Sequence, residues 1–457
     1  MGADRDARLF DPRLRADVPG PHGIPVVNNI RFWSRQLDYS RTRLAQYGDR
    51  PVVGVTGGNG SMVVVRGSEA ARQVLTDNTT FEHPSNSMLG LPPGRPYSTL
   101  FDATATLNGA RNVRSRKLLM PVMHRSALKE YDEVFAENFA RSRFARPGEP
   151  FDLVAELDRL TNANMLTCLI GLGPQDAPLG ERVTRLLHLT MDPRVFLFKR
   201  GQRTPYGRWL ELVASVHQEL SELIDRNRDK PPKVDALSIL CHATDEDGRL
   251  MSTAEIVGEL NGMLASGYLT TSASMGWALI ALAGSSSVRE AARGSDEYLE
   301  AVIKETQRVI PTVPMSLPRR VVSTVDIGGT DVPAGALLFL ATYLEHHNAD
   351  VFDRPDEFRP ERWADARPTP FEFFPFGAGA RRCLGAAFAD LQMRTTLRQI
   401  LQTGVPELLT ARLKHHMVGG VVAAPKGPLL IRIAPGAAAR DSSDVLTRFW
   451  NSLAVSS

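Results

Sequence analysis

The spacing of apolar residues along most of this chain is that of helices. Apolar positions recur every three or four residues in several stretches, which predicts helices at about 33–47, 109–120, 127–141, 152–172, 180–190, 209–226 and 386–401. Shorter runs rich in β-branched residues predict strands at 51–56, 61–65, 322–327, 336–341 and 429–433, the first two joined by a glycine-rich turn. The pattern indicates a mainly α fold with a small β-rich portion.

One further stretch is apolar on every side rather than along one stripe. Residues 260–288 carry no charged side chain, and a helix of this length would cross a bilayer. The stretch also holds Asn261, Ser266 and Thr270 and ends in three serines, so a buried central helix is the better interpretation. Ser252, followed three positions later by Glu255, predicts a capping box at its start.

Composition excludes several classes of protein. A net charge of +3 over 457 residues implies no nucleic-acid partner. The three cysteines, Cys168, Cys241 and Cys383, are far apart, which argues against a disulfide framework or a structural zinc site and favours a reducing compartment. The charged N-terminus lacks the apolar segment of a signal peptide. We expect a cytoplasmic protein without a membrane anchor, and a monomer.

Two irregular stretches contain apolar residues that look exposed. The first, 77–106, holds Met88, Leu89 and Leu91 among prolines and glycines, and the second, 191–208, holds Phe196. A long loop in a compact domain is usually functional or disordered. For the first stretch we expect a lid or pocket wall, with disorder as the alternative. The second has the composition of an entrance cover, although packing alone explains it equally well.

The chemistry is concentrated in the segment Phe374-Pro-Phe-Gly-Ala-Gly-Ala-Arg-Arg-Cys-Leu-Gly385. Cys383 would lie at the N-terminus of the helix predicted at 386–401, where unpaired N–H groups and the helix dipole favour an anion. A thiolate is such an anion and is also an iron ligand. Gly377 and Gly379 would permit a flat group to approach the backbone, and Arg381 adds a cation. By itself, however, a lone cysteine is usually a small apolar core residue.

The order Phe, Gly, x, Gly, x, Arg, x, Cys, x, Gly within this segment resembles the haem-binding loop of the cytochrome P450 family, the haem-thiolate monooxygenases. The resemblance implies the family's single domain, with haem b between the central helix and the cysteine loop. It covers residues 19–435, between a flexible leader at 1–18 and a tail at 436–457 that is frayed or weakly helical from 445 to 453. It also implies Cys383 as iron ligand and cofactor contacts from Phe376, Gly377, Arg381 and Gly385.

Other matches to the family lie outside this loop. Glu305 and Arg308 resemble its Glu-x-x-Arg motif, and Arg362 matches the arginine that completes a buried ion network. Arg319 and Arg116 match arginines that bind haem propionates, with Arg320 as a near alternative to Arg319. Asn112 stands where family members usually have an aromatic residue or histidine for the same purpose, so one propionate contact departs from the pattern.

The central helix carries Ala265-Ser-Gly-Tyr-Leu-Thr-Thr271, which resembles the family's oxygen-binding groove. Gly267, Thr270 and Thr271 match it, and Thr270 aligns with the threonine that helps deliver protons to dioxygen. Leu269 stands where an acid belongs, so a proton relay would need water, Thr271 or a polar substrate group. A threonine that merely bonds to the carbonyl one turn earlier is the alternative. The segment after the Glu-x-x-Arg helix would face the pocket over the haem with Thr312, Val313 and Met315.

The resemblance implies a monooxygenase that uses O2 to hydroxylate or otherwise oxidise a mid-sized apolar substrate, in what we expect to be a natural-product (secondary metabolite) pathway. Electrons would come from a separate ferredoxin and ferredoxin reductase, because the chain has no flavin module or dinucleotide motif. An acidic ferredoxin would meet basic residues, for which the candidates are Arg111, Arg114, Arg382 and Arg394. Two alternatives stay open: atypical chemistry such as peroxide-driven turnover, C–C coupling, cyclisation or desaturation, and a non-catalytic haem carrier or sensor.

Overall fold

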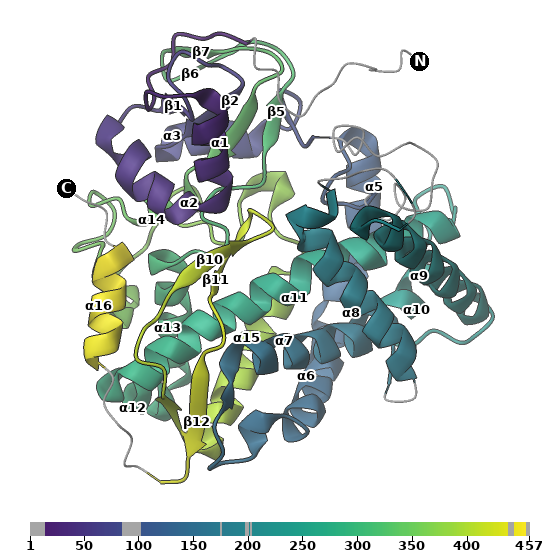
Figure 1. Cartoon of the computed structure of the whole chain (residues 1–457). Helices are drawn as coiled ribbons and strands as arrows, with labels where there is room; N and C mark the ends of the chain where they lie inside the picture. The colour runs from purple at the N-terminus through teal and green to yellow at the C-terminus, as the bar shows by residue number, and fades with distance from the viewer. Residues whose placement is uncertain are drawn as a thin grey trace.

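The computed structural model describes residues 14–84, 102–173, 176–196, 201, 203–436 and 443–453. Within this part of the chain, helices dominate and strands are short, as the apolar spacing predicted. The β-rich portion lies at the top of Figure 1 together with the first helices, and the larger helical portion fills the remainder.

The helices mostly agree with the predicted ranges. The α-helices are α1 (Pro25–Ser34), α2 (Gln36–Tyr39), α3 (Ser68–Thr76), α5 (Gly109–Leu119), α6 (Arg125–Ala140), α7 (Leu153–Met165), α8 (Ala177–Met191), α9 (Pro205–Arg228), α10 (Ala236–His242), α11 (Thr253–Gly284), α12 (Ser286–Gly294), α13 (Asp296–Val309), α14 (Thr342–His346), α15 (Ala386–Thr403) and α16 (Ser443–Leu453). The predicted helix at 33–47 is wrong as a single element. The helix begins earlier, with Pro25 presetting the first turn, and Arg35 then leaves helical geometry before α2 and two short turns follow.

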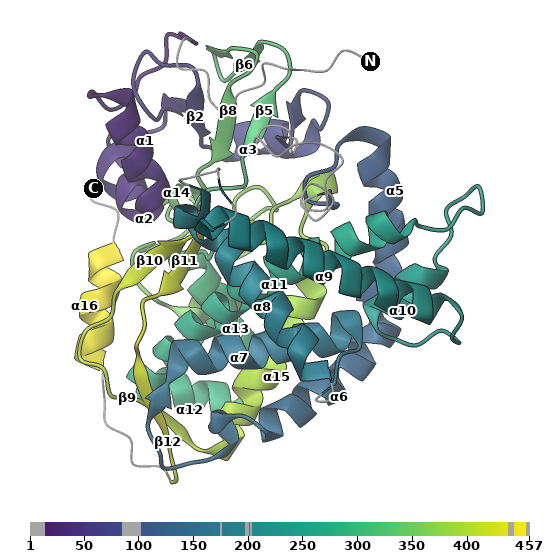
Figure 2. The same ribbon diagram turned by 45° about the vertical axis from the view of Figure 1, so that its right-hand side comes forward.

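Helix α11 runs through the middle of the molecule in both views (Figures 1 and 2), where α7, α13, α15 and strands β9 and β11 pack around it. The predicted capping box is confirmed, because Ser252 and Glu255 bond reciprocally at its start. Its 32 residues span about 48 Å at 1.5 Å per residue. Most of its side chains are buried, as expected of the uncharged stretch.

The strands form small sheets. The largest has the order β1-β2-β8-β5-β3, in which the predicted hairpin of β1 and β2 is confirmed and β8 joins β2 in parallel. The strands are β1 (Val52–Gly54), β2 (Met62–Val65), β3 (Phe81–Glu82), β4 (Phe151–Asp152), β5 (Arg319–Val321), β6 (Val325–Ile327), β7 (Thr330–Val332), β8 (Leu337–Leu340), β9 (Val405–Leu408), β10 (His415–Val418), β11 (Val422–Pro425) and β12 (Leu430–Ala434). The single strand predicted at 322–327 is wrong, because β5 ends at Val321 and only Val325–Ile327 of that range form a strand, β6.

The C-terminal helix α16 packs onto the core. Leu446, Phe449 and Trp450 are buried, and the ring of Phe449 stacks on Trp277 of α11 at 5.2 Å between centroids. The hydroxyl of Tyr343 also donates to the carbonyl of Leu453. The weak helical signal at 445–453 is thus confirmed, but the expectation of a frayed end is wrong for this helix, because its apolar face is covered.

Candidate active site

The cysteine loop leads directly into α15. Gly385 is the N-cap of this helix, and its N–H donates to the Cys383 sulfur, while the Cys383 N–H donates to the carbonyl of Phe376 at 2.8 Å. The side chain has one solvent-accessible side but is otherwise crowded by protein. This desolvation raises the pKa of the Cys383 thiol, and the Gly385 N–H and the charges of Arg382 and Arg116 counteract the rise only in part.

Glycines shape the backbone of the loop in two different ways. Gly377 and Gly379 both have positive φ, of 67° and 66°. A Cβ at Gly379 would meet the Leu75 carbonyl oxygen at 2.2 Å, so this glycine allows α3 to pack against the loop. A Cβ at Gly377 or Gly385 would meet no atom within 4 Å. Those two positions therefore leave room beside the cysteine for a bulky group.

Three arginines and a histidine from separate elements converge near Cys383. Arg319 on β5 and Arg381 repel each other, and Arg381 and Arg116 do the same. Burial, followed by the Arg381 charge, lowers the pKa of Arg319 to about 10. Arg319 is only 6% exposed, and its Nη1 has no hydrogen-bond partner among the described residues. An uncompensated buried cation of this kind fits an anionic ligand group.

His83 belongs to the same cluster and was missed by the sequence analysis, since nothing in the local pattern marks it. Burial, then Arg319 and Arg381, hold its pKa well below the ordinary value. His83 is therefore neutral at neutral pH, while the arginines stay charged. The signal that identifies it is proximity to β5 and to the cysteine loop, which only the fold provides.

The side chains of Arg381 and Asn112 both donate hydrogen bonds to the segment that precedes α5. Arg381 donates to the Leu107 carbonyl at 2.6 Å and to Asn108 Oδ1 at 2.8 Å. Asn112 is buried and donates its amide to the carbonyl of Thr104 at 2.7 Å. This hydrogen bond fixes the segment before α5, and a cofactor contact from Asn112 stays a prediction. Arg116 donates to the Arg382 carbonyl at 2.9 Å and so lies beside the cysteine loop.

This donor set fits haem. A sulfur accepts an N–H at a helix N-terminus, a buried guanidinium nitrogen is unpartnered, and two glycine positions leave open space. Iron ligation would supply the deprotonation that burial opposes, since a metal-bound thiol loses its proton. The arginines would balance the two propionate charges.

The predicted oxygen groove has a different local structure from the one expected. The Thr270 hydroxyl donates to the Ser266 carbonyl one turn earlier at 2.6 Å, which is the alternative weighed from the sequence. A Cβ at Gly267 would meet Met165 Cε at 2.2 Å, so this glycine admits α7 close to α11. Thr271 is buried, and Leu269 packs partly against the helical core.

The predicted pocket residues are only partly brought together. Thr312 is half-buried, and its hydroxyl is 2.6 Å from that of Ser274 on α11. Val313 is also half-buried. Met315, by contrast, is 1% exposed within the main core, so expecting it on the pocket wall is wrong. Met88, Leu89, Leu91 and the side chain of Phe196 lie outside the described residues.

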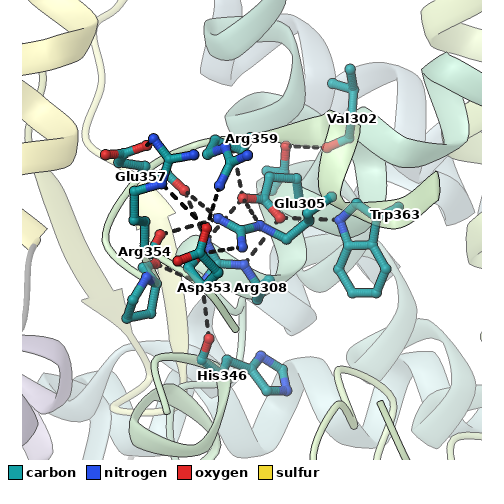
Figure 3. A network of polar contacts seen from close by, with 12 residues as sticks. Val302, Glu305, Arg308, His346, Asp353, Arg354, Glu357, Arg359 and Trp363 are labelled. Carbon is teal, nitrogen blue, oxygen red and sulfur yellow. Dashed lines mark hydrogen bonds and ion pairs between the residues drawn. The ribbon is translucent and has the colours of Figure 1, made fainter. Parts of the chain in front are cut away.

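A buried ion network is centred on Glu305 and Arg308 (Figure 3). Arg308 donates to both oxygens of Glu305 at 3.0 and 2.9 Å, and Arg362 adds a third bond at 3.0 Å. Arg308 also donates to the His346 carbonyl at 2.8 Å. The His346 ring accepts from the N–H of Phe374, the first residue of the loop, at 3.1 Å. His346, which the sequence analysis also missed, thereby links the network to the cysteine loop.

The basic residues expected to meet an electron donor are mostly engaged within the chain. Arg382 is exposed beside Cys383. The others form ion pairs: Arg111 with Asp102, Arg114 with Asp245 and Glu255, and Arg394 with Glu300. The prediction that these four residues meet a ferredoxin stays a prediction, and three of them already have acids within 3 Å that the sequence analysis did not associate with them.

Among the described residues, no helix is long and apolar enough to span a membrane. Comparison with known proteins gives a consistent result. The family model described as Cytochrome P450 matches residues 18–408. A protein of Mycobacterium tuberculosis named as a cytochrome P450 138 is 30% identical over 383 residues, covering 80% of this chain and 85% of its own length. Another from the same organism, named as a cytochrome P450 135B1, is 29% identical and covers 91% of each chain.

Solved structures show the same fold. The cytochrome P450DA heme domain has a TM-score of 0.76 at 19% identity, covering 94% of this chain and 100% of that one. Cyanobacterial CYP120A1, solved with retinoic acid bound, has a TM-score of 0.71 at 21% identity, covering 92% and 99%. A mutant of P450 EryK in complex with erythromycin B has a TM-score of 0.69 at 20% identity, covering 92% and 99%.

Proposed function

The chain belongs to the cytochrome P450 family and is a haem-containing monooxygenase, and from this premise we propose that Cys383 ligates the iron and that the substrate is a mid-sized apolar molecule. The observation that carries the proposal is the cysteine at the start of α15, with the Gly385 N–H on its sulfur. The buried Arg319 supports it, because its Nη1 has no hydrogen-bond partner in the part of the chain that the structure describes.

Each residue near the cofactor has a distinct task in this proposal. The Gly385 N–H stabilises negative charge on the Cys383 sulfur, and Arg116 adds a cation beside it. Arg319 binds one propionate, since it is buried and its Nη1 has no hydrogen-bond partner among the described residues. When bound, haem supplies the reductive activation of dioxygen, which no side chain can perform.

In this proposal, the residues of the oxygen groove on α11 have a positioning role and do not take part in bond making or breaking. Thr270 donates its hydroxyl hydrogen to the Ser266 carbonyl, which leaves its oxygen able to accept a hydrogen bond from a water molecule. We assign Thr270 to positioning at this point. Gly267 serves the packing of Met165, and Thr271 is buried, so neither has a direct chemical role in the proposal.

The substrate class and the electron donor rest on weaker similarity. CYP120A1 and EryK were solved with retinoic acid and erythromycin B, and the present chain shares their fold. A secondary metabolite of comparable size is the corresponding proposal here, bound in part by the half-buried Thr312 and Val313. We propose that a ferredoxin, reduced by its reductase, delivers electrons near Arg382, the exposed cation beside the ligand loop.

The proposal is tested by the spectrum of the reduced protein under carbon monoxide. The wild type should show the long-wavelength Soret position of thiolate-ligated iron, and Cys383→Ala should lose it. Cys241→Ala is the matched control, because Cys241 is buried on α10 and remote in sequence from the loop. A Cys383→Ala protein that kept the wild-type band would remove Cys383 from the ligand position.

A further inference from the structure

A cavity of ≈ 330 Å³ lies beside α11, between that helix, α7, the end of α8 and the hairpin of β10 and β11. Its wall includes Leu269, Ser272 and Gly276 of α11, which follow the three- and four-residue spacing of one helix face. Leu269 directly precedes Thr270 in the sequence. A side chain at position 269 therefore faces this cavity, and an acid placed there would face it too.

The cavity already has an acid, but it comes from a different helix. Asp158 of α7 lines the wall and accepts a hydrogen bond from the Ser272 hydroxyl. Burial raises the pKa of Asp158, while the Ser272 bond and His188 lower it and Asp152 raises it. The carboxyl thus holds a proton to higher pH than an ordinary aspartate does.

Two further side chains with polar groups line the cavity near this carboxyl. Tyr268 is 1% exposed, and its hydroxyl has no protein hydrogen-bond partner within the described part of the chain. His188 lies beside Tyr268, with 5.7 Å between the two ring centroids. One water occupies on the order of 30 Å³, so the cavity has room for several. The ion pair of Asp192 and Arg194 lies at another part of the wall.

We propose that Asp158, acting through water in this cavity, supplies protons past Leu269 to the neighbouring Thr270 of the oxygen groove and so replaces the acid that α11 lacks at position 269; Thr270 itself does not line the cavity. This inference rests on the proposed function. In the monooxygenase reaction, dioxygen, two electrons and two protons convert a substrate C–H bond into C–OH and release one water. Asp158 gives up a proton from its carboxyl oxygen and regains one from solvent. The electrons come from the external donor.

A rival acid on the same helix is less suited to this task. Glu259 is buried but accepts three hydrogen bonds, two from Thr104 and one from Ser115. It also lies eleven residues before Thr270, about 16 Å along the helix. Its carboxylate is occupied in fixing the segment before α5, whereas Asp158 has one protein donor from Ser272 and adjoins open space.

The first test measures where the electrons go. The assay contains NADPH, a plant-type ferredoxin and its reductase. In it, Asp158→Asn should oxidise NADPH about tenfold more slowly than the wild type does. This loss of rate is smaller than that expected for removing a direct general acid, because water mediates the transfer. It should also release a larger share of reduced dioxygen as hydrogen peroxide and change the solvent deuterium isotope effect. Asp158→Glu and the double variant Asp158→Asn/Leu269→Asp should recover. Asp225→Asn on α9, remote from the cavity wall, is the matched control.

The second test begins with a measurement that needs no turnover. The infrared carboxyl stretch of protonated Asp158, absent in Asp158→Asn, should be present at the working pH of the enzyme. Ser272→Ala removes a bond that lowers the pKa, so the titration of that band and the pH at which turnover declines should both move upward. Unchanged electron partition in Asp158→Asn, or a missing carboxyl band, overturns the proposal. A wild type without the thiolate carbon monoxide band would instead refute the proposed function.

Discussion

Replacing Glu305 by glutamine removes the charge at the centre of the buried network in Figure 3. Glu305 and Arg308 are both 0% exposed. The carboxylate accepts from Arg308, Arg362, the Trp363 indole at 3.0 Å and the Arg359 N–H at 2.8 Å. Glutamine has the same shape but only one acceptor oxygen. Its amide nitrogen is itself a donor, so it cannot accept the hydrogen bonds that the second carboxylate oxygen of Glu305 accepts.

The expected loss of stability follows from the Arg308 charge, which stays buried when Glu305 loses its own. Breaking a buried ion pair by removing one partner costs about 3–5 kcal/mol, because the other charge stays buried without compensation. Arg308 keeps three bonds to the carbonyls of His346, Pro355 and Glu357, and these moderate the loss. We therefore expect Glu305→Gln to lower the apparent free energy of unfolding by about 3 kcal/mol, the lower end of that range.

Urea titration of the haem-bound protein, followed by far-UV circular dichroism and by the Soret band, measures this change. Because Arg308 bonds to His346 and His346 to Phe374, the rate of haem loss to apomyoglobin should also rise. Glu69→Gln is the control, since its pair with Arg72 is exposed and should change little. A loss below about 1 kcal/mol, the usual value of a surface pair, would refute the idea of a structural lock.

Four other outcomes follow from the same structure. Burial and Arg308 lower the pKa of His346 to about 3. As the pH falls below 6.5, this histidine is therefore protonated in the unfolded chain before it is protonated in the folded one. Stability should be full above pH 6.5 and fall by at most about 1.4 kcal/mol per pH unit toward pH 3 for this residue, as thermal melting against pH would show. Gly379→Ala should slow haem incorporation and lower the melting temperature, because a Cβ would strike the Leu75 carbonyl from a positive φ. Arg319→Gln should weaken haem affinity at least tenfold in a haem-transfer assay, whereas equal affinity would exclude a propionate contact. Trp450→Ala should destabilise the protein by about 3–5 kcal/mol in urea titration if α16 packs as described, and a neutral effect would contradict that packing.

Several features were predictable because they are local in sequence. The central helix and its cap depend on an uncharged run and on Ser252 with Glu255, which lie within one turn. The start of α15 and its cysteine follow from the glycines and the amphipathic run around them. Glu305 and Arg308 are three positions apart on a helix, so their proximity needed no tertiary information.

The features that the sequence did not reveal depend on contacts with residues that are not neighbours along the chain. Asn112 occupies a position that matches a propionate contact, and its hydrogen bond to the Thr104 carbonyl was not foreseen. Arg114 was a candidate contact for a ferredoxin, and its ion pair with Asp245, more than a hundred residues away, could not be foreseen. The C-terminal residues looked frayed, but α11 and the loop bearing Phe358 cover their aromatic rings.

The amino-acid sequence by itself determined the helical character, the buried central helix and the cysteine loop, since these depend on periodicity and on neighbouring residues. Only the tertiary structure decided which acid faces the cavity beside Leu269, which cations near Cys383 lack a partner, and that His83 and His346 adjoin the site. The physical reason is that burial and charge compensation act through space, so they are set by residues that the chain brings together from distant positions.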